Sequence, residues 1–167
     1  MATSQSLSEQ LNAARDISKS AQENISNILN IAKIQDLSDQ QAIELAAETT
    51  RIEAAAIDIF AVFEARMQHH FKRGPFSRKL KAALLAAGHP DLADRLHQHY
   101  LAINVLKHGT GASYRELLNN KSTLFAVKPV NAGGTDNTTG LIDVTLPYFF
   151  DRLAETILEA SNFLEHR

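Results

Sequence analysis

The stretch from Ser38 to Phe71 decides the fold and reads SDQQAIELAAETTRIEAAAIDIFAVFEARMQHHF. It contains neither Gly nor Pro, and Ser38 followed three residues later by Gln41 is the capping-box pattern of a helix N-terminus. In its second half, apolar side chains cover more than half of the helix circumference: Ile52, Ile57, Ile59, Phe60, Phe63, Met67 and Phe71. A helix that is apolar on so many sides is buried. We therefore expect this helix to be the central and most buried element.

Helical periodicity continues on both sides of this stretch. It predicts helices over residues 7–34, 77–87, 90–108, 113–120 and from 147 to near the C-terminus. Gly88 and Gly109 are placed to end two of these helices, and Ser113 with Glu116 forms a second capping box. The pattern indicates a mainly α fold, an antiparallel helical bundle of four long helices plus two short ones.

Residues 122–145 do not follow the helical pattern. Two short β-like runs, 124–130 and 141–145, flank the polar and Gly-rich segment 131–140. We expect a small β-hairpin insertion with a mobile tip before the C-terminal helix. Because Pro129 cannot donate a hydrogen bond to a ladder, its strand lies at an edge or carries a bulge. The whole chain, 1–167, is then one helical-bundle domain with a disordered N-terminus over residues 1–6.

Composition narrows the class of protein. The chain has 167 residues, of which 44% are hydrophobic and 22% charged, and it has no Cys. Disulfides, thiolate catalysis and Cys-ligated metals are thereby excluded. No apolar run approaches the roughly 18 residues that a membrane-spanning helix needs, and the N-terminus lacks the features of a secretory signal. We expect a cytoplasmic protein with no membrane partner.

Charge is distributed unevenly along the chain. Residues 1–64 hold four basic and ten acidic side chains, whereas residues 65–90 hold six basic and none acidic. This basic patch, with the histidines beside it, comprises Arg66, His69, His70, Lys72, Arg73, Arg78, Lys79 and Lys81. It is either a solvated surface or a binding site for phosphate or nucleic acid, in which Phe71 and Phe76 could stack on bases.

A polar column marks the helix expected over residues 90–108. His97, Asn104 and His108 follow one another at steps of seven and four residues, so they share one face. They are either hydrogen-bonded to another helix or a second subunit, or they carry out chemistry. The chain has no His-x-x-His, His-x-x-x-His or Glu-x-x-His, so we expect no metal and no cofactor. Only distant residues, for example Glu64 with His97 and His108, could assemble a metal site.

The segment from Asn104 to Gly109 reads NVLKHG, late in a helix of an all-helical domain. Here the chain resembles the HEPN superfamily, whose ribonuclease members carry Arg, four to six residues, then His, often with Asn directly after the Arg. The resemblance implies a dimeric bundle whose two motif helices meet in a cleft, and RNA cleavage in active members. Asn104 and His108 match the motif, but Ile103 stands at the Arg position. The resemblance therefore implies a HEPN-like domain without the nuclease motif.

Three functions follow from these patterns and from the resemblance, the first of them from the resemblance. The first is a non-catalytic HEPN-like binding or regulatory module that acts as a homodimer, with a protein partner, in a bacterial defence or toxin–antitoxin type system. The second is a phosphodiester-cleaving enzyme that uses His108, Asn104 and His97, with Arg95 or Arg73 supplying positive charge. The third is an RNA- or other nucleic-acid-binding protein that uses the basic patch. Salt dependence separates them, because phosphate binding weakens steeply with salt and apolar association does not.

Overall fold

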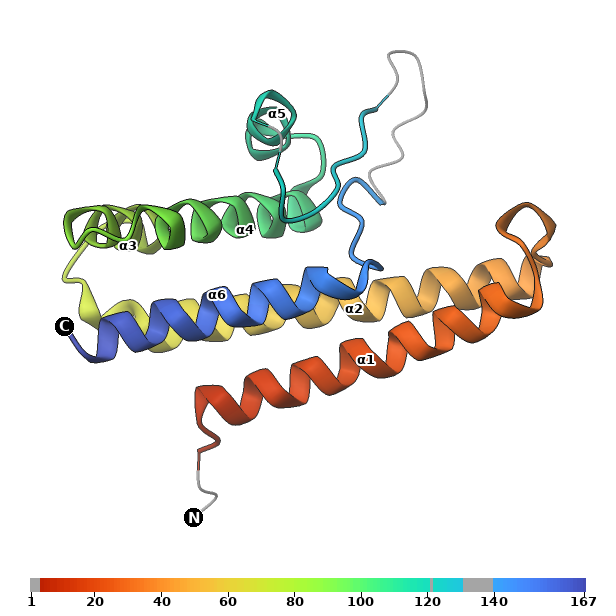
Figure 1. Ribbon diagram of the computed structural model, residues 1–167, viewed down its shortest axis with the longest axis horizontal. Helices are drawn as coiled ribbons and strands as arrows, with labels where there is room; N and C mark the ends of the chain where they lie inside the picture. Colours follow the sequence, from red (N-terminus) through yellow and green to blue (C-terminus); the bar gives the residue numbers. More distant parts are fainter. Residues whose placement is uncertain (1–3, 121, 131–139) are drawn as a thin grey trace.

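The computed structural model describes residues 4–120, 122–130 and 140–167. In these residues the chain is mainly helical, with six α-helices and no sheet (Figure 1). The mainly α class predicted from the sequence is confirmed. None of the helices in the described part is long and apolar enough to cross a membrane.

The N-terminal third of the chain forms a long helical hairpin. Helix α1, Leu7–Ile31, begins at a capping box in which Ser6 and Glu9 exchange hydrogen bonds. After a short 3-10 turn, Ile34–Asp36, helix α2 runs over Asp39–Met67. Its predicted capping box is confirmed. The backbone N–H of Gln41 donates to Ser38 Oγ at 3.1 Å, and the backbone N–H of Ser38 donates to Gln41 Oε1 at 3.0 Å.

The remaining helices pack on this hairpin. They are α3 (Phe76–Ala86), α4 (Pro90–His108), α5 (Ala112–Asn119) and α6 (Pro147–Glu165). Gly88 and Gly109 follow α3 and α4 with φ of 82° and 72°, so these glycines end the helices in the left-handed region as predicted. Helices α2 and α6 lie between α1 on one side and the α3–α4 pair on the other, and α5 sits on α4 (Figure 1).

The buried side chains confirm that the second half of α2 lies in the core, but they correct the prediction that α2 is the most buried helix. Ile52, Ile59, Phe60, Phe63 and Met67 are all buried. However, α2 buries seven of its 29 residues and α6 buries nine of its 19, so α2 is not the most buried helix. The reason is that no residue of α2 before Ile52 is buried, because this half of the helix extends beyond α6 (Figure 1).

The prediction of a β-hairpin over residues 122–145 is wrong for the residues of this segment that the structure describes. One isolated antiparallel bridge joins Val127 and Ile142, and the flanking residues form no strands. The Tyr114 hydroxyl of α5 donates to the Lys128 carbonyl at 2.7 Å and accepts from the Val130 N–H at 2.9 Å. The Tyr114 hydroxyl therefore binds backbone groups that a neighbouring strand would otherwise bind. Pro129, between these two residues, has no N–H to donate to such a strand. The predicted mobile tip, 131–140, lies outside the described residues except for Gly140.

Candidate functional site

The polar column predicted on α4 joins α4 to α5. His97 Nε2 lies 2.7 Å from Glu116 Oε1, and Asn104 Nδ2 donates to Ser113 Oγ at 3.3 Å. Ser113 and Glu116 therefore do not form the predicted capping box: α5 begins at Ala112, and Gly111 is its N-cap. Two of the three candidate residues, His97 and Asn104, are thus hydrogen-bonded to a neighbouring helix of the same chain.

The three candidates do not converge on one point. His108 is the last residue of α4, is exposed, and makes no hydrogen bond to the described residues. It lies 11 residues from His97, which is roughly 16 Å along a helix axis. The side chain at the position of the missing Arg, Ile103, is 1% exposed and belongs to the core. An arginine at that position would be buried, on a different side of α4 from His108.

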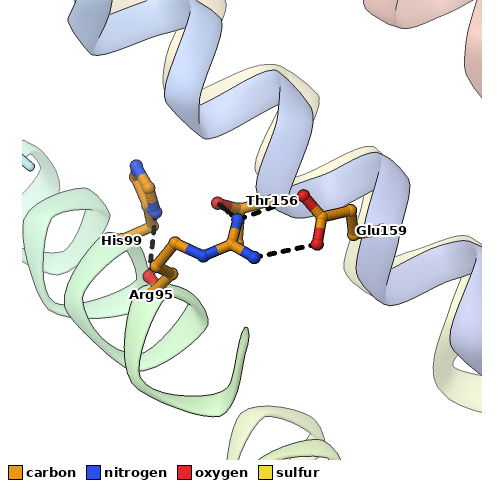
Figure 2. Close-up of polar contacts among 4 residues, drawn as sticks. All are labelled: Arg95, His99, Thr156 and Glu159. Atoms are coloured by element: carbon orange, nitrogen blue, oxygen red, sulfur yellow. Dashed lines mark hydrogen bonds and ion pairs between the residues drawn. The ribbon is translucent and has the colours of Figure 1, made fainter. Parts of the chain in front are cut away.

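A second polar group lies between α4 and α6 (Figure 2), and the sequence had suggested only one of its members, Arg95, as a site residue. Arg95 pairs with Glu159, with nitrogen–oxygen distances of 2.8 and 3.3 Å, and its guanidinium also donates to Thr156 Oγ1 at 3.4 Å. His99, one turn further along α4, is 1% exposed and donates from Nδ1 to the Arg95 carbonyl at 2.8 Å. The sequence signal for this group was a histidine on the apolar face of α4, one turn after an arginine.

The imidazole of His99 is held in its neutral form. Burial lowers its pKa from 6.5 to about 4, and the nearby Arg95 and Arg152 cations act in the same direction, against the hydrogen bond to the Arg95 carbonyl. With Nδ1 donating, Nε2 is a lone-pair acceptor, and it is buried without a partner in the described structure. Phe125 lies beside the ring, with a centroid distance of 6.0 Å. His99 is therefore not accessible as an acid or base, whereas the Arg95–Glu159 pair lies at the exposed edge of the contact between α4 and α6.

The basic patch is divided between internal contacts and solvent. Arg66 is tied to the N-terminus of the fold, since it donates to Gln10 Oε1 at 3.1 Å and to the Gln5 carbonyl. His69 lies against His70 with a centroid distance of 4.2 Å, and Lys81 is partly buried. The other members are exposed cations that form no ion pair within the described residues: Lys72, Arg73, Arg78 and Lys79.

The prediction that Phe71 and Phe76 could stack on bases is wrong for Phe76. Phe76 is 5% exposed and packs edge-on against Phe63 and Phe71, at centroid distances of 5.4 and 5.9 Å. Phe71 is partly exposed, and the guanidinium of Arg167 covers its ring at 5.4 Å. Phe76 is therefore a core residue that cannot stack on a base.

Three surface cavities in the described part of the chain lie away from the candidate residues. One of about 420 Å³ between α1 and α6 is lined in part by Arg15, Lys19, Gln22 and Asp151. Two others, of about 410 and 390 Å³, border the segment 122–130. Over the described ranges, no three His, Asp or Glu side chains are placed together to hold a metal ion.

Comparison of the chain with protein-family models, with curated proteins and with solved structures yields no match.

Proposed function

We propose that this chain is a non-catalytic binding module of the HEPN-like kind that acts as a homodimer. One observation carries the first part of the proposal: two of the three polar residues proposed for catalysis are engaged in holding helices together, and the third, His108, lies away from them at the end of α4. His97 and Asn104 bind α5 through Glu116 and Ser113, and the buried Ile103 occupies the position where the resemblance places Arg.

The enzyme alternative is less well supported by the same geometry. Phosphodiester cleavage needs an acid or base and a cation within reach of one phosphate. His108 is exposed at the end of α4, and Arg95, one of the two arginines considered for this role, is paired with Glu159. Arg73, the other one, lies in the basic patch that follows α2. In the bacterial defence or toxin–antitoxin type of system that the resemblance implies, the module would act by binding a protein partner.

An RNA cleavage assay tests the proposal. Wild type and His108→Ala are incubated with a mixed-sequence RNA between pH 5.5 and 8, with His166→Ala as a control for an exposed histidine near the C-terminus. We expect the three proteins to leave the RNA intact to the same extent. Cleavage by wild type and by His166→Ala that disappears in His108→Ala, with a rate that titrates like an imidazole, would show instead that the protein is a nuclease.

A further inference from the structure

The part of the α1–α2 hairpin that extends beyond α6 carries large apolar side chains that are exposed in the described part of the chain. Ile31 is 79% exposed, Ile34 is 71% exposed and Ile43 is 62% exposed. These three lie at the end of α1, in the turn, and at the start of α2, so they form one end of the molecule (Figure 1). Large aliphatic side chains gathered in this way are typical of a protein contact surface.

One face of α2 is exposed from this end to the other. Steps of three and four residues place the following side chains on that face, and all are exposed: Ile43, Ala47, Thr50, Ala54, Asp58, Ala61 and Ala65. The opposite sides of α2 contact α1, α4 and α6. The exposed face is therefore free to receive another helix, and its short side chains let a second backbone come close.

Side chains of opposite charge lie next to the two ends of α2. Asp36 and Asp39 precede and begin α2, and both are exposed. Lys72 and Arg73 follow its C-terminus, are exposed, and have no carboxylate partner in the described part of the chain. A nucleic acid would account for the cations alone, whereas a second copy of this chain accounts for the cations, the acidic end and the exposed Ile43 together.

We propose that two copies of this chain pack the exposed faces of α2 against each other, antiparallel, around a two-fold axis at Ala54. The register follows from the spacing of the exposed face, which is symmetric about Ala54: Ile43 falls opposite Ala65, Ala47 opposite Ala61, and Thr50 opposite Asp58. The same register places the acidic end of each copy level with the basic end of the other. Two identical contacts then close the dimer. This inference rests on the homodimer in the proposed function, but it places the interface on α2 and not on α4, the helix at which the resemblance implies that the two copies meet.

Cysteine cross-linking tests the axis, because the chain has no cysteine of its own. A residue on a two-fold axis meets its own copy, so Ala54→Cys brings two thiols within disulfide range. The control is Ala13→Cys, at an exposed alanine of α1. On mild oxidation of the full-length protein at 50 μM, we expect most of Ala54→Cys and little of Ala13→Cys to become a covalent dimer.

A charge exchange tests the register. By sedimentation velocity in low salt, Asp36→Lys and Lys72→Asp should each raise the dimer dissociation constant roughly tenfold, since each removes two ion pairs per dimer. The double variant should return to within about threefold of wild type, because it rebuilds both pairs in reverse. Glu155→Lys, at an exposed site of α6, is the matched control and should leave the constant unchanged.

Each failure has its own meaning. A monomeric wild type at 50 μM would overturn both the homodimer of the proposed function and this surface. A dimer in which Ala54→Cys cross-links no better than Ala13→Cys would overturn the surface alone. RNA binding that is lost in Lys72→Asp while dimerisation is unchanged would assign the basic end to nucleic acid and also overturn it. None of these results bears on catalysis, which the RNA cleavage assay decides separately.

Discussion

The buried His99 should make this protein sensitive to mild acid. Its pKa in the folded state, about 4, lies below the value of 6.5 expected in the unfolded chain. Protonation therefore favours the unfolded state, so the neutral imidazole's contribution to stability is complete above pH 6.5 and is lost as the pH falls toward 4. The structural cause is burial at 1% exposure next to the Arg95 and Arg152 cations.

The size of the effect follows from the two pKa values. Their separation corresponds to about 3 kcal/mol once the imidazole is protonated in both states, and to about 2 kcal/mol between pH 7.5 and pH 5. Substitution His99→Leu removes the titrating group and replaces it with an apolar side chain of similar volume. At pH 7.5 we expect this variant to stay within about 1.5 kcal/mol of wild type, the usual limit for a volume-conserving change.

Urea unfolding of wild type and His99→Leu at pH 7.5, 6 and 5 measures this difference. Wild type should lose about 2 kcal/mol more than the variant over that range. Glu53 and Glu64, whose pKa values burial raises, titrate in both proteins and cancel from the difference. His166→Leu is the control, because His166 makes the same Nδ1 hydrogen bond to a backbone carbonyl but is exposed. If wild type and His99→Leu lost stability in parallel, the assignment of a buried neutral imidazole would be refuted.

Three further predictions concern the core, the 122–130 segment and metal content. Phe63→Ala should lower the free energy of unfolding by about 3 to 5 kcal/mol because Phe63 is fully buried. Ile17→Ala, at a site 43% exposed, should lower it by less than about 1 kcal/mol. Similar losses for both variants in urea unfolding would contradict the core assignment. Tyr114→Phe removes the hydroxyl that holds Lys128 and Val130, so hydrogen exchange of the Val130 amide should become roughly tenfold faster, and an unchanged rate would mean that water replaces the hydroxyl. Elemental analysis of the purified protein should find no stoichiometric zinc or iron, and one metal ion per chain would disprove this.

Most helix boundaries could be predicted from the sequence because their causes are local. The capping box of Ser38 and Gln41, Pro90 at the first position of α4, and the left-handed Gly88 and Gly109 act within one turn of the chain. Apolar periodicity likewise identified the buried half of α2. Ser113 shows the limit of such local reasoning, since its sequence pattern fits a capping box but its hydroxyl accepts from Asn104 of another helix.

The roles of the candidate site residues were decided by packing between segments far apart in the sequence. His97 meets Glu116, Arg95 meets Glu159, and Phe76 enters the core only because the turn after α2 folds α3 back onto Phe63. Spacing along one helix says which side chains share a face, but not which helix covers that face. Whether a polar side chain is available for chemistry depends on that covering helix, because a partner removes both its hydrogen-bonding capacity and its access to water.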